Sequence, residues 1–324
     1  MGFGRTQDAV VTSRSNARVK QLRAAFAGQA RLSGGLVAVE GDNLLGEALR
    51  SGLVLKTVFV SDGRTLPGMV PHGVEVMWLT EEVFASVVET RAPQGVAALL
   101  VPPVHELQDV VGLEGAKAVS PSLDAHLSRD ETATKMGHPD SWQRAPLILV
   151  AAGLQDPGNL GTLVRSAEAF GASGVLTTPG TVSGWNQKAL RASAGSIFRV
   201  PVVGVGVDEL AAFKRGGVRL LAAVAEDYAD TVSAQNVDFR GACAVMIGNE
   251  GSGLSEELLE LADVRVTIPC PGRVESLNAA IAGSLLLYEA SRQRANKPTH
   301  RDKAAMDGAH NQFRSDATTS GQGA

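Results

Sequence analysis

The sequence predicts an α/β protein whose main sheet is mostly parallel, with helices on both faces, preceded by a smaller α/β domain. Segments of strand and helix character alternate through residues 146–294, which is typical of a parallel sheet. Residues 147–151 are apolar throughout, as in a parallel strand covered on both faces. Residues 11–101 alternate in the same way on a smaller scale, and residues 102–145 separate the two regions.

Composition limits the function classes. The chain has 324 residues, 44% of them hydrophobic and 20% charged, which is enough for two globular domains. No apolar run reaches the ~18 residues of a membrane helix, and the N-terminus lacks the apolar core of a signal peptide. Cys243 and Cys270 are too few for a disulfide framework. We expect a cytoplasmic protein without a membrane segment.

Residues 11–101 are predicted to form the small domain. Residues 11–34 resemble an exposed basic helix, because Val19, Leu22 and Phe26 recur at helical spacing among basic residues. The other expected elements are strands 36–40, 55–60, 74–78 and 95–101 and helices 43–51 and 80–89. No clustered His, Cys or paired carboxylate occurs here, so binding rather than catalysis is expected.

Residues 102–145 lack clear periodicity and are predicted to be a flexible linker or insertion. The region holds three histidines without tight ligand spacing or a cysteine partner, so no metal site is expected: His105, His126 and His138. Residues 295–324 are polar and aperiodic, and we expect a disordered tail.

The large domain, residues 146–294, begins with strand 147–151. Turn residues 156–158 follow, then Asn159 as the predicted N-cap of a helix that Gly171 closes. The next expected elements are strand 174–177, basic helix 185–193, strand 200–205, helix 208–215 and strand 220–224.

Two glycine-rich turns then follow two strands. Strand 242–247 leads into turn 248–253 and an acidic helix from Ser255; strand 264–268 leads into a Pro-Gly loop and a long helix from about Ser276. Small ligands of open α/β sheets bind at the carboxyl ends of the strands. Turn 248–253 matches neither G-x-G-x-x-G nor the P-loop, which disfavours a phosphate cradle. An ordinary turn is the alternative.

Basic residues cluster in two places, although the net charge is −4. Within residues 1–35, Asp8 is the single acid among six arginines and lysines, and residues 185–200 contain three basic residues and no acid. Two such clusters favour a phosphate-binding face over solvated surface. The candidate RNA-binding residues are Arg14, Arg18, Lys20, Lys188 and Arg191, with Arg199 in the second cluster.

Arg165 is the sharpest single candidate. It lies in an otherwise small and apolar helix, where it either pairs with Glu168 on the surface or directs its guanidinium into the strand-end cleft. Glu250 is either an acid in that cleft or a carboxylate that stabilises its turn. Asn159 is primarily a helix cap. No Ser-His-Asp, Cys-His or metal constellation is present, which disfavours hydrolytic and metal-assisted chemistry.

Three motifs, in order and spacing, resemble the SpoU (TrmH-type) family of RNA ribose 2′-O-methyltransferases of the SPOUT superfamily. The first is NLGTLVR at 159–165, continuing into AFG at 169–171. The second is IGNEGSGL at 247–254. The third is Ile-Pro at 268–269, followed by Ser-Leu-Asn at 276–278. The segment KALRASAG at 188–195 also resembles the family.

The resemblance implies a C-terminal trefoil knot, an S-adenosylmethionine site formed by the knot, and a homodimer with the active site at the subunit interface. It places Arg165 as the residue that activates the ribose hydroxyl; the other matching active-site positions are Asn159, Glu250, Ser276 and Asn278. By motif position the cofactor-binding residues are Gly248, Asn249, Gly253, Ile268, Pro269 and Leu277.

The N-terminal region resembles the family's RNA-binding extension through TSRSN at 12–16, VEG at 39–41 and PQG at 93–95. Ala17 and Ala279 depart conservatively from the family pattern, and the 102–145 insertion is longer than usual. The resulting hypothesis is an S-adenosylmethionine-dependent methyltransferase that acts on a ribose 2′-hydroxyl of rRNA. The alternatives are a catalytically inactive RNA-binding protein with the same fold and a tRNA-directed methyltransferase.

Overall fold

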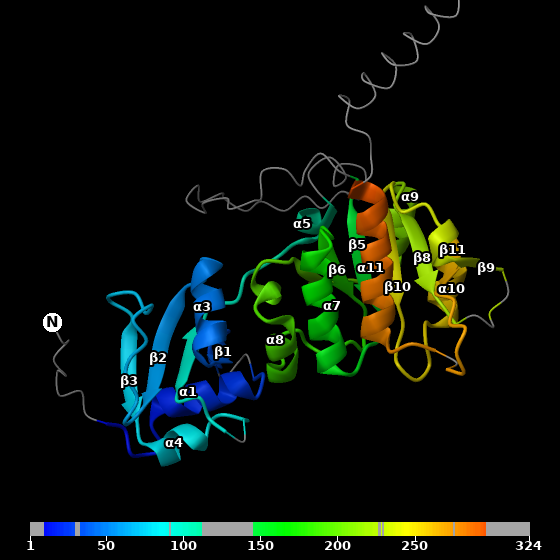
Figure 1. Cartoon of the computed structure of the whole chain (residues 1–324). Helices are drawn as coiled ribbons and strands as arrows, with labels where there is room; N and C mark the ends of the chain where they lie inside the picture. Colours follow the sequence, from blue (N-terminus) through cyan, green and yellow to red (C-terminus); the bar gives the residue numbers. More distant parts are fainter. Residues whose placement is uncertain are drawn as a thin grey trace, which may run out of the picture.

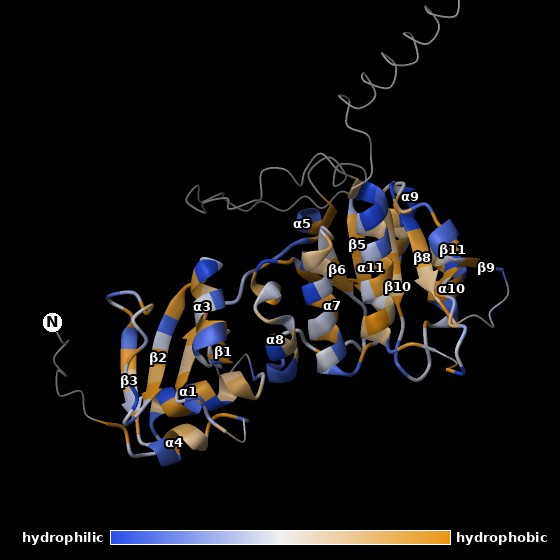
Figure 2. Cartoon of the chain, in the orientation of Figure 1, coloured by the Kyte–Doolittle hydropathy of each residue, from blue (hydrophilic) through white to orange (hydrophobic). Residues whose placement is uncertain are grey.

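The computed structural model describes residues 10–295, except 30–32, 91, 112–144, 226–227, 229 and 275. The described chain forms two sheets, each covered by helices (Figure 1). Hydrophobic residues concentrate in the strands and alternate with hydrophilic ones along the helices (Figure 2). No described helix is both long and apolar enough to cross a membrane.

The N-terminal sheet has four strands in the order β1-β4-β2-β3. β4 pairs antiparallel with β1 and β2, and β2 pairs parallel with β3, so the sheet is mixed. The strands are β1 (Val37–Glu40), β2 (Leu55–Ser61), β3 (Glu75–Leu79) and β4 (Val96–Leu100). α1 (Ala17–Phe26) and α4 (Glu81–Ala85) cover one face, and α3 (Asp42–Arg50) packs on the other.

Two predicted helices of this region are shorter than expected. α1 has ten residues and begins at Ala17, because the Asn16 side chain accepts a hydrogen bond from Arg18 N and caps it. Its residues Val19 and Leu22 are fully buried against the sheet. α4 begins after Thr80, which caps it as predicted, but ends at Ala85.

The large sheet has seven strands in the order β7-β6-β5-β10-β8-β11-β9, and all its pairs are parallel. The predicted parallel sheet is therefore confirmed. The strands are β5 (Leu147–Ala151), β6 (Gly174–Thr177), β7 (Val202–Gly204), β8 (Arg219–Ala223), β9 (Thr231–Ser233), β10 (Cys243–Ile247) and β11 (Val264–Thr267). Edge strand β9 has only three residues and was not predicted.

Helices cover both faces of this sheet, as predicted. α7 (Pro157–Ala169) and α11 (Ala279–Ala295) pack side by side on one face, and α8 (Gln187–Ser193) packs against α7 (Figure 1). α9 (Val207–Arg215) and α10 (Glu256–Leu261) lie on the opposite face. Both faces of β5 and β10 are consequently buried, which explains their continuous apolar sequence.

Part of the expected linker is ordered. Within residues 102–145, α5 (Leu107–Val111) packs against β6 and β7, and its Val110 and Val111 belong to the same hydrophobic core as residues of α9. No helix was expected within residues 102–145, because two adjacent valines are too short a pattern to reveal one; the flexible linker or insertion otherwise stays a prediction. His126, His138 and the tail from residue 296 lie outside the described residues.

The last strands enter the interior of the sheet. β10 lies between β5 and β8, and β11 lies between β8 and β9, so the chain inserts strands instead of adding them at an edge. This order suits the expected trefoil knot, which itself stays a prediction.

The two sheets contact each other through α8 and α3. The buried Gln187 Nε2 donates a hydrogen bond of 2.9 Å to Ala38 O of β1. Arg199 Nη1 donates to Glu47 Oε2 of α3 at 2.7 Å. The N-terminal sheet is therefore attached to the face of the large sheet on which α7 and α8 lie.

Candidate functional site

The candidate site lies where three parallel strands end. β5, β10 and β11 run in the same direction, so the loops that follow them meet at one edge of the sheet. Backbone contacts confirm this convergence, because Ala152 N donates a 2.8 Å hydrogen bond to Ile247 O. The site is built from these loops and from the first residues of the helices that follow.

The loop after β10 is a closed turn. Asn249 and Gly253 exchange two backbone hydrogen bonds of 2.9 Å, and Asn249 Oδ1 accepts from Gly251 N. Asn249 Nδ2 donates to Gly153 O at 2.8 Å, which ties the turn to the loop after β5. A Cβ at Gly248 would lie 2.2 Å from the carbonyl carbon of Gly253, so only glycine permits this closure.

Asn159, Glu250 and Asn278 form a hydrogen-bonded chain across the three loops. Asn159 Nδ2 donates to Glu250 Oε1 at 2.7 Å, and Asn278 Nδ2 donates to Asn159 Oδ1 at 3.0 Å. Backbone N–H groups of Gln155 and Asp156 also point to the Glu250 carboxylate, at 3.4 Å each. The structure thus brings together three of the five predicted catalytic residues.

The Glu250 carboxylate is held as an anion. Burial alone would raise its pKa, but the hydrogen bonds from Asn159 and the neighbouring backbone outweigh burial and lower the pKa below its ordinary value. Of the two roles open for Glu250, the contacts favour the stabilising carboxylate.

The predicted cap of α7 was wrong. Asp156 is the N-cap, accepting hydrogen bonds from Gly158 N and from Asn159 N (3.1 Å), and Pro157 takes the first helical position. Asn159 lies inside the first turn, which frees its side chain for Glu250. Asp and Asn are equally good caps, so local sequence could not decide between them.

α11 begins three residues later than expected. Asn278 caps it, with Oδ1 accepting from Ala280 N at 2.9 Å. Ser276 therefore lies in the preceding loop, is exposed, and makes no side-chain hydrogen bond to any described residue. Its catalytic assignment stays a prediction.

Arg165 is exposed on α7 and stands apart from the polar chain. Within the described part of the chain its guanidinium has no hydrogen bond or ion pair. The alternative of a pair with Glu168 is wrong, because Glu168 pairs with Arg199 instead.

Three of the predicted cofactor residues lie in the turn after β10, and the other three lie in the loop after β11. Ile268 and Leu277 are half-buried and Pro269 is exposed. Just before them, the Thr267 hydroxyl is buried without a hydrogen-bond partner, and so is the hydroxyl of Ser233 opposite it on β9. Unpaired buried hydroxyls are uncommon in proteins, so this edge offers polar groups to a ligand. The sequence pattern gave no signal for either.

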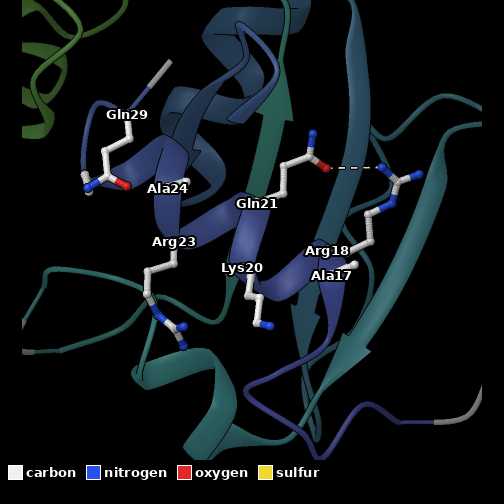
Figure 3. A pocket seen from close by; sticks show the side chains of 8 residues that line it. Ala17, Arg18, Lys20, Gln21, Arg23, Ala24 and Gln29 are labelled. Atoms are coloured by element: carbon white, nitrogen blue, oxygen red, sulfur yellow. Dashed lines mark hydrogen bonds between the residues drawn. The ribbon is translucent and has the colours of Figure 1, made fainter. Parts of the chain in front are cut away.

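A concave surface of about 730 Å³ lies away from this edge, along α1. Figure 3 shows Lys20 and Arg23 projecting from α1, with Arg18 hydrogen-bonded to Gln21. The side chains of Lys20 and Arg23 make no hydrogen bond or ion pair with described residues, whereas Arg18 pairs with Glu75 at 3.1 Å. Arg23 was not among the predicted RNA-binding residues.

The other basic candidates differ in their partners. Arg14 pairs with Glu82 at 2.8 Å, and Lys188 pairs at 2.7 Å with Asp156, the cap of α7. Arg191 is exposed and has no partner among the described residues. The sequence placed Arg199 in an open basic cluster. In the structure it does not belong to such a face, because it pairs with two carboxylates.

No group of three or more His, Cys, Asp or Glu among the described residues could hold a metal ion.

Comparison with known proteins identifies the family. Residues 146–288 match the model of the SpoU rRNA Methylase family, and residues 16–98 match that of an MRM3-like substrate binding domain. The chain is 30% identical over 282 residues to a 23S rRNA (guanosine(2553)-2′-O)-methyltransferase of Bacillus subtilis, covering 86% of this chain and 97% of the relative. It is 28% identical to the human mitochondrial rRNA methyltransferase 3, covering 80% and 68%.

Solved structures agree. An AdoMet-bound rRNA methyltransferase from Sinorhizobium meliloti has a TM-score of 0.68 and 27% identity, covering 88% of this chain and 97% of that one. A SpoU methyltransferase from Streptomyces viridochromogenes, in complex with AdoMet, has a TM-score of 0.68 and 26% identity, covering 87% and 99%. The parallel sheet and the glycine turn agree with these relatives. The chain belongs to the SpoU family of rRNA methylases.

Proposed function

We propose that this protein transfers a methyl group from S-adenosylmethionine to a ribose 2′-hydroxyl of ribosomal RNA. The observation that carries the proposal is the convergence of the Asn159–Glu250–Asn278 chain and the closed 248–253 turn at one sheet edge. Family membership and relatives named as rRNA 2′-O-methyltransferases support the substrate. We infer the cytoplasm as the compartment because such a substrate is found there.

The residues present fit the cofactor. The Thr267 and Ser233 hydroxyls lack protein partners, and the 248–253 turn exposes backbone beside half-buried Ile268 and Leu277. We assign Gly248, Asn249, Gly253, Ile268, Pro269 and Leu277 to this pocket. When bound, S-adenosylmethionine supplies an electrophilic methyl group on a sulfonium.

The protein must place the 2′-oxygen and assist the loss of its proton. The guanidinium of Arg165 offers hydrogen-bond donors and no acceptor, so it does not take up the proton. We assign it to holding the RNA and stabilising charge that develops on the oxygen, while an adjacent RNA phosphate accepts the proton. Asn159, Glu250 and Asn278 hold the loops in register, and Ser276 lies beside them in the same loop as Leu277.

Gly248→Ala should weaken cofactor binding. The added Cβ would lie 2.2 Å from Gly253 backbone, so the turn must open. Titration calorimetry with S-adenosylmethionine should show at least about tenfold weaker binding, which is about 1.4 kcal/mol. Gly251→Ala is the matched control, since its Cβ would meet only the Asn249 side chain at 3.5 Å. Equal affinity in both variants would contradict this pocket; no binding by the wild type would favour the catalytically inactive alternative.

Arg165→Ala should lose methylation and keep the cofactor. Because the exposed Arg165 side chain makes no hydrogen bond or ion pair with a described residue, its removal should change stability little. Transfer of labelled methyl groups to 23S rRNA transcribed in vitro should fall about 100-fold or more, as for loss of other charge-stabilising groups. Full activity would refute this role. Methylation of tRNA but not rRNA would favour the tRNA-directed alternative.

We further propose a homodimer that buries the outer faces of α7 and α11. Ile281, Leu285 and Tyr288 are 53%, 44% and 53% exposed and recur on one side of α11. The exposed positions of neighbouring α7 include Thr162 and Arg165. Such an apolar stripe is typical of a protein interface, and a dimer through it places Arg165 at the subunit boundary.

Ile281→Glu with Leu285→Glu should give a monomer. Two buried carboxylates at the interface oppose association, because each must lose its hydration. Sedimentation velocity should show half the wild-type mass, with loss of methylation. Val104→Glu alters a residue that is 87% exposed outside this face and should leave the mass unchanged. A wild-type monomer at micromolar concentration would contradict the dimer.

The concave face of α1 is proposed to hold RNA phosphate. Lys20 and Arg23 are unpaired there, and Arg14 and Arg18 are surface ion pairs that RNA phosphates can displace, since exposed pairs contribute little stability. We assign Lys188 and Arg191 to the same RNA through their positions on α8.

Lys20→Ala with Arg23→Ala should weaken RNA binding and reduce its salt dependence. Each lost phosphate contact lowers the slope of log K against log salt by about 0.7 to 0.9. Filter binding across a salt series measures this slope. The control for net charge is the double variant Lys56→Ala with Arg215→Ala, which removes two basic residues outside α1. An equal change of the salt slope in this variant would exclude a specific role for the α1 face.

A further inference from the structure

Arg199 joins two carboxylates from distant parts of the chain. It directly follows η2 (Ser196–Phe198), and its Nε and Nη2 donate to both oxygens of Glu168 on α7, with Nη2 at 3.0 Å from Oε2. Its Nη1 donates to Glu47 at 2.7 Å and to Ser51 at 3.0 Å, both in or beside α3. The two-pronged contact with Glu168 is the strongest form of an arginine–carboxylate pair.

Glu168 lies three residues after Arg165 on the same helix. Side chains at this spacing are neighbours, and opposite charges there attract. Burial would raise the Glu168 pKa, but hydrogen bonds from Arg199 and Ser196 lower it, so this carboxylate is an anion at neutral pH. An anion one turn away is a ready partner for Arg165, yet in the structure both of its oxygens are bound by Arg199.

We propose that Arg199 is a positioning residue: by binding both oxygens of Glu168, it leaves the Arg165 guanidinium unpaired and available to the RNA. The inference rests on the proposed role of Arg165. Glu47 of α3 also pairs with Arg199, through Nη1, a nitrogen that does not contact Glu168. Removing Arg199 would release Glu168, and the released carboxylate would compete with RNA for Arg165.

The test measures kcat on 23S rRNA transcript with RNA and S-adenosylmethionine both saturating. Arg199→Ala should lower kcat about three- to fivefold. A surface ion pair of this strength would hold Arg165 against Glu168 in most molecules and leave it available to the RNA in the rest. The loss should shrink as salt rises, because salt screens the new pair. Arg199→Ala with Glu168→Gln should restore the wild-type rate, since an amide does not hold Arg165. An unchanged kcat in the single variant, or no recovery in the double variant, overturns the inference.

Glu47→Gln is the matched control. It changes the same cluster by one charge but keeps the pair between Arg199 and Glu168, so kcat should stay at the wild-type value. A loss equal to that of Arg199→Ala would show that the contact with α3 matters instead, and would overturn the inference. Thermal unfolding confirms that each variant folds; if Arg199→Ala does not, Arg199→Lys should show a smaller loss that Glu168→Gln again restores.

Arg165→Ala, assayed beside these variants, separates the two proposals. A wild-type rate for Arg165→Ala refutes the proposed function of Arg165. A strong loss in Arg165→Ala with a normal rate in Arg199→Ala refutes only the inference about Arg199.

Discussion

The close packing of α7 is the constraint on which the rest of the site depends. A Cβ at Gly161 would lie 2.3 Å from the backbone oxygen of Ala189 on α8, and a Cβ at Gly283 on α11 would lie 2.4 Å from Leu163. Gly161 thus lets the backbone of α8 approach α7 closely, and Gly283 leaves room for the Leu163 side chain of α7 against α11. Such packing leaves α7 little freedom to shift, so Asn159, near its start, keeps its place relative to the loops after β10 and β11.

Much of this arrangement could be predicted from local sequence. β5 and β6 were placed to the residue, because each is an apolar run bounded by turn residues. The glycine turn after β10 was also recognised from its sequence. Its closure depends on Gly248, which meets residues only five positions away. Features determined by neighbours in sequence were therefore accessible without a structure.

The errors came from contacts between residues distant in sequence. Glu168 has Arg165 three positions away, yet it pairs with Arg199, 31 positions away. Likewise Asn159 has the chemistry of a cap, but Glu250, 91 positions away, takes its side chain while Asp156 caps the helix. In both cases the local sequence offers a chemically suitable partner, and the tertiary structure brings in a different one. The buried Thr267 hydroxyl without a hydrogen-bond partner could not be predicted either, because no sequence pattern shows whether a buried polar group has a partner.

The charges at the site also limit how a proton can leave the ribose. Glu250 is the acid in the polar chain, but Asn159 and two backbone N–H groups hydrogen-bond its carboxylate and lower its pKa. Stabilised in this way, the carboxylate is a weaker base than a free one. The guanidinium of Arg165 offers only hydrogen-bond donors and no acceptor. Neither charged residue proposed for the site is suited to accept the proton, and this favours an acceptor on the RNA, where each 2′-hydroxyl lies beside a phosphate.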